Sequence, residues 1–283
     1  MSKPESMHGK TCLVTGATSG IGLYTALGLS LLGADVGLVG RSPERIETAI
    51  QILQTRGGRP PRHVLWADLS SLSQVRLLAE QVRERLPRLD VLVNNAGGVF
   101  RRREETGDGL ERTFALNHLC PFLLTHLLLE RMSSGSRIIT VASDSHRSAR
   151  IQFDDLQLRR GYNAFRAYAN SKLGNIWFTY ELARRLKEKG ISANTLTPGM
   201  VSTNLGKQNI VYRPFLSLMF ALFGKPPSQG AETPVFLASS PAVEGVSGRY
   251  FVDKRAVPSS PQSYDEAAAR RMWEMSGELA GIG

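Results

Sequence analysis

Tyr168 and Lys172 are spaced so that they could handle a proton together. In Tyr168-Ala-Asn-Ser-Lys172 the phenol and the ammonium stand four residues apart. In a helix, both would lie on one face, one turn from each other. We then expect the ammonium to lower the pKa of the phenol from its reference value of about 10. Tyr168 could therefore exchange a proton with a bound oxygen near neutral pH.

A glycine-rich run near the N-terminus has the composition of a phosphate-binding turn. It follows a strand-like run and precedes an apolar, helix-like one. Its glycines permit a tight turn and let backbone N–H groups approach a pyrophosphate at a helix N-terminus. The spacing, GxxxGxG, departs from the GxGxxG fingerprint, and a plain strand-to-helix turn is the alternative. The residues concerned are Gly16, Thr18, Ser19, Gly20, Ile21 and Gly22.

The residues after the second strand-like run bear on which dinucleotide would bind. A fold that prefers NAD usually places an acid there, which accepts hydrogen bonds from the ribose 2′-hydroxyl. This chain has Gly40-Arg41-Ser42. Because a guanidinium suits a phosphate, the sequence favours NADP(H) over NAD(H). A solvated arginine at a helix start is the alternative for Arg41, and Asp68-Leu69 would lie beside the adenine.

The composition excludes several other classes of protein. The 283 residues are 42% hydrophobic and 21% charged, which argues against disorder, and the formal charge is +10. This charge admits nucleic acid, an anionic membrane or a phosphorylated ligand as partner. However, Arg101-Arg102-Arg103 is followed by Glu104-Glu105, without interleaved aromatic residues. We therefore expect local ion pairs there and no nucleic-acid partner.

The cysteines and histidines indicate neither disulfides nor a metal. Cys12 and Cys120 stand alone in apolar stretches, which is typical of a reducing compartment, and we expect a cytoplasmic protein. His118, His126 and His146 fit no metal-ligand spacing, so we expect no metal site; only His146 lies near the expected cleft. The N-terminus lacks the apolar region of a signal peptide, and no stretch approaches the ~18 apolar residues of a membrane span.

The elements that must position these residues follow an alternating pattern. Apolar, β-branched runs alternate with longer helix-period segments, as in βαβ units. We expect a doubly wound parallel sheet in a three-layer α/β fold, with residues 1–283 as one domain. The expected strands are Thr11–Thr15, Asp35–Val39, His63–Ala67, Val91–Asn94, Arg137–Ala142, Ser192–Thr197 and Gly248–Val252. The expected helices are Gly20–Leu32, Pro43–Thr55, Ser70–Leu86, Leu110–Met132 and Ala167–Gly190.

An ordered series of motifs resembles the short-chain dehydrogenase/reductase superfamily over about Lys10 to Val252. The motifs are TGxxxGIG, Asn94-Asn95-Ala96-Gly97, Asn117, Ser143, YxxxK and Pro198-Gly199. The resemblance implies a Rossmann-type fold and an oxidoreductase in which hydride moves between a nicotinamide and an alcohol or carbonyl carbon.

The resemblance also implies roles for individual residues. Tyr168 would be the general acid and base, and Lys172 would lower its pKa and hold the ribose of the nicotinamide. Ser143 would hydrogen-bond to the substrate oxygen, with Ser145 as a fallback. Asn117 would hold the water that links Lys172 to solvent.

Further cofactor contacts follow from the same resemblance. Asn94, Asn95, Ala96 and Gly97 resemble the strand end that supports the adenosine ribose. Pro198-Gly199 resembles the turn over the nicotinamide. There, the backbone of Val201 would contact the carboxamide, and Thr203 would lie near the phosphates.

Some segments are similar to the retinol dehydrogenase branch, and others depart from it. The insertion with Ile151-Gln-Phe-Asp-Asp-Leu156, together with Glu181–Leu186 and Ser247–Phe251, is similar to that branch. Cys120 stands where the branch usually has glycine, and Pro121 follows. We expect an adjustment of packing there, with activity retained.

The stretch over residues 207–228 bears on the substrate. Its segment Tyr212–Phe223 carries aromatic residues and a methionine. We expect a mobile lid over a lipophilic substrate, such as a retinoid, a steroid or a polyketide-like or aromatic ketone. A helix packed on its own core and a shallow contact with a membrane surface are the alternatives.

Other functions and assemblies stay open from the sequence. The same fold could carry out epimerisation or reduction of a C=C bond, or serve as a dinucleotide-binding regulator without turnover. A homodimer or homotetramer through the helix that bears Tyr168 is a further expectation from the resemblance.

Overall fold

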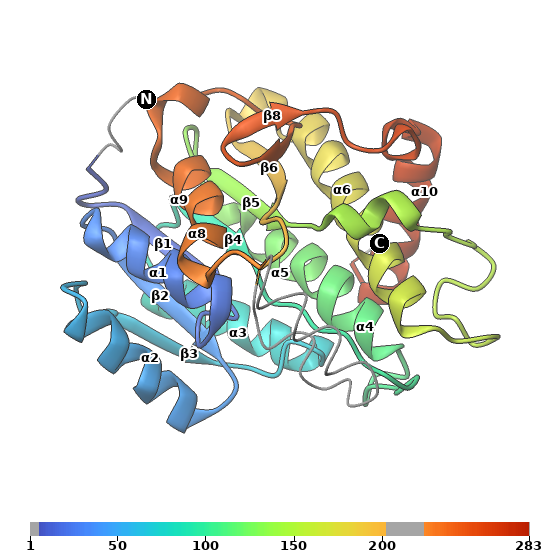
Figure 1. Cartoon of the computed structure of the whole chain (residues 1–283), viewed down its shortest axis with the longest axis horizontal. Helices are drawn as coiled ribbons and strands as arrows, with labels where there is room; N and C mark the ends of the chain where they lie inside the picture. Colours follow the sequence, from blue (N-terminus) through green and yellow to red (C-terminus); the bar gives the residue numbers. More distant parts are fainter. Residues whose placement is uncertain (1–5, 202–223, 283) are drawn as a thin grey trace.

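Eight strands form one sheet in the computed structural model, which describes residues 6–201 and 224–282 (Figure 1). Their order is β3-β2-β1-β4-β5-β6-β7-β8, and all pairs are parallel except β7 with β8. The strands are β1 (Thr11–Thr15), β2 (Asp35–Gly40), β3 (His63–Trp66), β4 (Val91–Asn94), β5 (Arg137–Val141), β6 (Ser192–Thr197), β7 (Tyr250–Val252) and β8 (Arg255–Val257). The expected doubly wound parallel sheet is confirmed.

Helices cover both faces of this sheet. In β1, Leu13 packs on the face that carries α3, α5 and α6, whereas Cys12 and Val14 pack on the face that carries α1, α2 and α9. Both faces of the strand are buried, which is why it reads as a continuous apolar run. The helices are α1 (Gly20–Leu31), α2 (Pro43–Thr55), α3 (Leu72–Arg85), α4 (Arg112–Phe114), α5 (Cys120–Leu128), α6 (Ala164–Arg185), α8 (Pro227–Gly230), α9 (Glu232–Ser239) and α10 (Glu266–Ala280).

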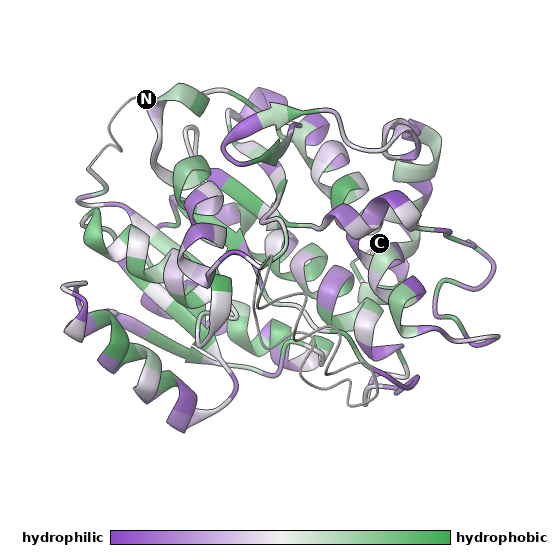
Figure 2. Ribbon diagram, in the orientation of Figure 1, coloured by the Kyte–Doolittle hydropathy of each residue, from purple (hydrophilic) through white to green (hydrophobic). Residues whose placement is uncertain are grey.

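The α2 helix shows how local sequence sets these boundaries. Ser42 is its N-cap and accepts the N–H of Arg45, and Pro43 takes the first turn, where its missing N–H costs nothing. One stripe, formed by Ile46, Ala49 and Leu53, is buried on the sheet. Figure 2 shows this pattern: hydrophobic and hydrophilic residues alternate along α2.

One expected helix differs in its detail. The segment Leu110–Met132 is helical from Arg112 to Arg131, but a π-helical stretch, Ala115–Leu119, separates α4 from α5. Pro121 has no N–H to donate to the carbonyl of Asn117, four residues earlier, so regular α-helical bonding cannot continue there. Beyond β7, the antiparallel strand β8 and the helix α10 were not predicted from the sequence.

The parallel order of the strands places the loops that carry the candidate site residues at one edge of the sheet. From β1 the chain winds outward through β2 and β3, then returns to β4 on the other side of β1. In such sheets ligands bind at this reversal, outside the carboxyl ends of the strands. The loops after β1, β4, β5 and β6 all leave from that edge. Most of the expected lid, residues 207–228, lies outside the described residues. Among the residues that the structure describes, no helix is long and apolar enough to cross a bilayer.

Candidate active site

The glycine turn after β1 is shaped by close backbone contacts. Gly16 and Gly20 have positive φ angles, +64° and +54°. A Cβ on Gly22 would lie 2.3 Å from the carbonyl oxygen of Gly16 and 2.4 Å from Nδ2 of Asn95. The Asn95 amide donates to the carbonyl of Thr15 at 2.8 Å. The loop after β4 therefore supports the turn, and the turn requires glycine at position 22.

The N-terminus of α1 points out of this turn. Ser19, its N-cap, makes no capping hydrogen bond with its side chain. The first N–H groups of the helix therefore receive no bond from that side chain, which suits an anion such as a pyrophosphate. Thr18 lies against Gly40, where a Cβ would approach its methyl group to 2.5 Å, and this contact joins the turn to the end of β2.

Arg41 and Asp68 lie at the ends of β2 and β3. Arg41 is exposed. Partial burial raises the pKa of Asp68, but hydrogen bonds from Ser70 and the charges of Arg41 and Arg112 outweigh it and lower the pKa overall. Arg41 is thus close enough to Asp68 to stabilise its charge. The side chain of Leu69 is buried in the core.

The π-helical stretch positions Asn117. Its Nδ2 donates to the carbonyl of Gly98 and to Oγ of Ser171, both at 3.0 Å, and its Oδ1 accepts the N–H of Gly98 at 2.8 Å. A Cβ on Gly97 would lie 3.2 Å from this Oδ1 and 3.5 Å from Nζ of Lys172. Asn117 and Lys172 therefore face the same small space beside Gly97.

Tyr168, Lys172 and Ser143 come together where β5 ends beside α6. Lys172 is buried, with Nζ donating to the carbonyl of Val141 at 2.8 Å and lying 5.5 Å from the centre of the Tyr168 ring. The Ser143 hydroxyl forms a hydrogen bond with the Tyr168 hydroxyl, and this bond lowers the pKa of the phenol. Ser143 Oγ also accepts the N–H of Ser145, which caps the 3-10 turn Asp144–Ser148.

The direction of the Tyr168 pKa shift differs from the expected one. Loss of contact with water raises the pKa of Tyr168, and the Ser143 hydroxyl offsets this only in part. Lys172 is not among the causes of this shift; its Nζ lies 5.5 Å from the centre of the Tyr168 ring and donates to the carbonyl of Val141. Burial lowers the pKa of Lys172 itself to about 8. In this structure Tyr168 is therefore a protonated phenol at neutral pH.

The turn after β6 contains the remaining candidates. Gly199 has a φ of +75°, which favours glycine after Pro198. Val201 is buried, and a Cβ on Gly230 would meet both Val201 and Ile21, so these three lie together at the N-terminal end of α1. Thr203 lies outside the described residues.

These residues fit a dinucleotide. The turn excludes any side chain at position 22, and the helix N-terminus beyond it lacks a side-chain cap. At the carboxyl edge of the sheet, the ends of β2 and β3 on one side of this turn carry Arg41 and Asp68. The ends of β4 and β6 on the other side carry Asn95, Ala96 and Pro198-Gly199, and Tyr168 and Lys172 lie on this side. No acid follows β2 directly; the residue there is Arg41.

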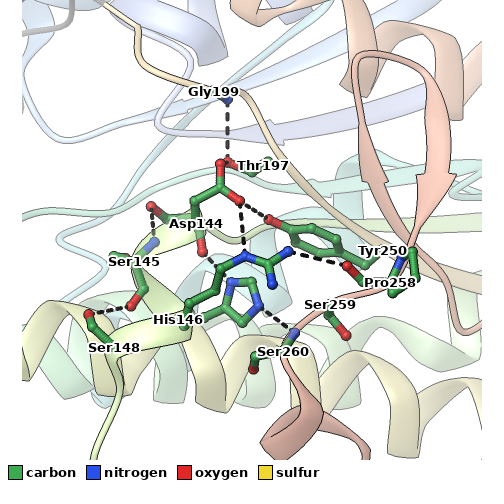
Figure 3. Close-up of polar contacts among 12 residues, drawn as sticks. Asp144, Ser145, His146, Ser148, Thr197, Gly199, Tyr250, Pro258, Ser259 and Ser260 are labelled. Carbon is green, nitrogen blue, oxygen red and sulfur yellow. Dashed lines mark hydrogen bonds and ion pairs between the residues drawn. The ribbon is translucent and has the colours of Figure 1, made fainter.

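The sequence analysis did not assign a role to Asp144, Thr197 or His146. His146 Nε2 accepts the N–H of Ser260 at 3.0 Å, so Nδ1 carries the proton and donates to the carbonyl of Ser143 at 2.7 Å. Burial lowers the pKa of His146, which keeps the ring neutral. His146 thus fixes the Ser143 loop against the segment before α10 (Figure 3). Its place directly after the strand was the available indication.

Other polar residues singled out in the sequence have structural partners. His118 is buried, 2.9 Å from Oγ of Ser276, and His126 lies 2.7 Å from the carbonyl of Phe122. Arg103 pairs with Glu105 at 2.7 Å. Within residues 6–201 and 224–282, no cluster of His, Cys, Asp and Glu could hold a metal ion.

Comparison with known proteins identifies related sequences. The family model described as short chain dehydrogenase matches residues 10–210. Retinol dehydrogenase 14 of Mus musculus is 44% identical over 294 residues, which cover 99% of this chain and 88% of the relative. A Streptomyces sp. (strain C5) protein, named as a daunorubicin C-13 ketoreductase, is 42% identical over 97% of this chain and 94% of its own length.

Solved structures share the fold. An uncharacterised protein from Mycobacterium Paratuberculosis has a TM-score of 0.81 and 31% identity, covering 99% of this chain and 96% of its own. A short chain dehydrogenase from Burkholderia cenocepacia J2315, solved in complex with NADP, has a TM-score of 0.69 and 26% identity, covering 87% of this chain and 97% of its own.

Proposed function

Because this chain belongs to the short-chain dehydrogenase family and is an alcohol/carbonyl oxidoreductase, we propose that it uses NADP(H) and acts on a lipophilic substrate with Tyr168 as general acid and base. The observation that carries the proposal is the meeting of three side chains. The hydroxyls of Tyr168 and Ser143 interact beside the buried ammonium of Lys172. When bound, the nicotinamide supplies or accepts the hydride at its C4.

The chain's own residues handle the oxygen of the substrate. Ser143 donates a hydrogen bond to this oxygen and Tyr168 exchanges a proton with it, which stabilises the charge that develops there. The raised pKa keeps Tyr168 in the protonated form, which is the form needed when a carbonyl becomes an alcohol. In the reverse direction the phenolate of Tyr168 takes up the proton of the alcohol, and the positive charge of Lys172 favours the phenolate that this step requires.

Two lines of support favour a lipophilic substrate. Phe165, with 64% of its surface exposed, precedes Tyr168 by three residues on α6 and therefore lies on the same helix face. Met200, also exposed, follows Gly199. The name of one relative refers to retinol, a largely apolar alcohol, and that of another to a C-13 ketone of daunorubicin. We propose an apolar alcohol or ketone of the retinoid, steroid or polyketide-like class.

Arg41 supports the choice of NADP(H). It is exposed at the end of β2, where a 2′-phosphate would form charge-assisted hydrogen bonds with the guanidinium. A neighbouring structure contains NADP. We further propose a cytoplasmic location, based on the two unpaired, buried cysteines, Cys12 and Cys120, and cell fractionation would check it.

The decisive experiment measures turnover of a panel of apolar ketones and alcohols with NADPH and NADH. Tyr168→Phe is expected to lower kcat by about 10²–10⁴-fold, because the proton donor is lost, and to leave the Kd of NADPH nearly unchanged. Retained turnover in this variant would overturn the role of Tyr168. A product reduced at C=C, or an epimer, would overturn the reaction.

The cofactor choice needs a separate pair of variants. Arg41→Ala is expected to raise the Kd of NADPH by about tenfold and to leave that of NADH unchanged. Arg56→Ala, an exposed arginine at the other end of α2, is the matched control. An equal Kd for NADPH in wild type and Arg41→Ala would contradict the proposed contact.

A further inference from the structure

Asp144 follows Ser143 directly and connects three segments that are far apart in the sequence (Figure 3). Its Oδ2 accepts a hydrogen bond from Oγ1 of Thr197 at 3.3 Å, at the end of β6. Its Oδ1 accepts a hydrogen bond from the hydroxyl of Tyr250 at 3.0 Å, at the start of β7. The carboxylate therefore lies between the loop that carries Ser143 and the last two parallel strands.

Thr197 extends this connection to the turn after β6. Its Oγ1 accepts the backbone N–H of Gly199 at 3.3 Å. The directions of the bonds are fixed, because a backbone N–H can only donate and a carboxylate can only accept. The Thr197 hydroxyl thus donates its proton in a hydrogen bond to Asp144 and accepts the N–H of Gly199 with a lone pair. Figure 3 shows Gly199, Thr197 and Asp144 in one row.

Arg147 lies near the carboxylate of Asp144, whose side chain is 54% exposed. Nε of Arg147 lies 3.9 Å from Oδ1 of Asp144, and Nη2 of Arg147 donates to the carbonyl of Pro258. On the other side of the loop, His146 is bonded to Ser143 and Ser260. The Ser143 loop is therefore fixed from both sides, and Asp144 is the side chain that ties it to the turn.

We propose that Asp144 is a positioning residue that sets the separation between Ser143 and the Pro198-Gly199 turn. The inference rests on the proposed function, in which Ser143 holds the substrate oxygen, and on the expectation that the Pro198-Gly199 turn lies over the nicotinamide. Displacements of about 1 Å between reacting groups can cost about 10²-fold in rate. The Asp144–Thr197–Gly199 row is a polar link through side chains between the two sides of the reaction, beside the backbone bond from Ala142 to Leu196.

The first test is kinetic and uses Asp144→Ala, Thr197→Val and the double variant. Each single variant is expected to lower kcat about tenfold, with a smaller change in the KM of the carbonyl substrate. Because both changes break the same link, the double variant should be no slower than the slower single one. Asp144→Asn, which keeps an oxygen acceptor, should recover part of the rate. Multiplicative losses in the double variant, or wild-type kcat in Asp144→Ala, would overturn the proposal.

The second test does not depend on activity. Hydrogen exchange of the Gly199 amide is expected to be at least about tenfold faster in Thr197→Val and in Asp144→Ala than in wild type. Asp154→Ala is the matched control, since Asp154 is an exposed carboxylate of the same connection that pairs with Arg160 and contacts neither Thr197 nor Tyr250. Unchanged exchange at Gly199 in Asp144→Ala would overturn the proposed link.

The two tests also separate this proposal from the proposed function. A wild-type protein that reduces no carbonyl compound, with Gly199 exchange that still responds to Asp144, would contradict the function and keep the link. Normal wild-type turnover with no response to Asp144 would contradict only the link. A lower melting temperature of Asp144→Ala with unchanged kcat and unchanged Gly199 exchange would reduce Asp144 to a purely structural role.

Discussion

Lys172 carries a positive charge into the interior of the protein. Only 4% of its surface is exposed, and Nζ has the Val141 carbonyl as hydrogen-bond acceptor. Burial disfavours the charged form and lowers the pKa of Lys172 from 10.5 to about 8. The site thus holds a lysine that can lose its proton not far above neutral pH.

This pKa predicts how stability depends on pH. Between pH 8 and 10.5 the unfolded chain keeps a proton on Lys172 that the folded chain has lost. The contribution of Lys172 to the free energy of unfolding therefore rises with pH in this range, by up to about 1.4 kcal/mol per pH unit. Below pH 8 the full cost of burying the charge is present.

Urea unfolding of wild type and Lys172→Met between pH 7 and 9.5 measures this contribution. Buried groups with raised pKa values, such as Cys12 and Cys120, destabilise both proteins at alkaline pH and cancel in the difference. The difference between the two should change with pH, in favour of wild type as the pH rises. Lys187→Met, at an exposed lysine, should run parallel to wild type. If the stability of Lys172→Met ran parallel to that of wild type over this pH range, the pKa of Lys172 would not be lowered in the folded protein.

At the residue scale, spacing was informative where chemistry is local. Tyr168 and Lys172 could be placed on one helix face because four residues make about one turn. The pKa of Tyr168 could not be predicted, because it depends on burial. Asp144 was also missed, since its partners Thr197 and Tyr250 are 53 and 106 residues away in the sequence.

At the scale of elements, the turn between β1 and α1 depends on a missing side chain. The carbonyl of Gly16 and the amide of Asn95 occupy the place that a Cβ on Gly22 would need. A backbone carbonyl cannot move aside as a flexible side chain can. The turn and the loop after β4 are thus held together by packing that only glycine permits.

Gly22→Ala should therefore lower both stability and cofactor binding. We expect a loss of about 1–3 kcal/mol in the free energy of unfolding, typical of overpacking, and an NADPH Kd at least about tenfold higher. Gly107→Ala is the matched control, because a Cβ there meets nothing within 4 Å. Denaturant unfolding and NADPH titration check both values. Near-wild-type NADPH binding in Gly22→Ala would mean that the turn does not hold the cofactor.

Element boundaries were predictable where buried strands alternate with capped helices. They were not predictable at Ala115–Leu119, because an apolar helical period continues through the π-helical stretch. β8 has three residues and follows a turn in which Asp253 and Lys254 have positive φ, which no Asn-Gly or Asp-Gly pair announces. For α10 the indications were present: Asp265 is its N-cap and Gly281 ends it.

At the scale of the whole molecule, α10 covers part of the helix that bears Tyr168. Trp273 of α10 stacks on Phe178 of α6, with ring centres 5.9 Å apart, and meets Phe122 of α5 edge-on at 5.1 Å. The guanidinium of Arg185 lies over the Trp273 ring at 4.4 Å. This part of α6 is covered by α10 within one protomer, and a homodimer or homotetramer through the helix that bears Tyr168 stays a prediction.

Trp273→Ala tests whether α10 is held by this cluster. We expect the free energy of unfolding to fall by about 2–3 kcal/mol, somewhat less than for a fully buried aromatic residue, since Trp273 is partly exposed. Trp273→Phe should recover part of this loss, because it keeps a ring against Phe178.

Trp66→Ala, at a tryptophan that is 46% exposed on the edge strand β3, should cost less than about 1 kcal/mol. Far-UV circular dichroism during urea unfolding gives these values without relying on tryptophan fluorescence. Light scattering after size exclusion should give the same mass for wild type as for Trp66→Ala, and a larger mass for Trp273→Ala if the uncovered face of α6 pairs with a second copy. A stability of Trp273→Ala equal to that of wild type would show that α10 does not depend on the cluster.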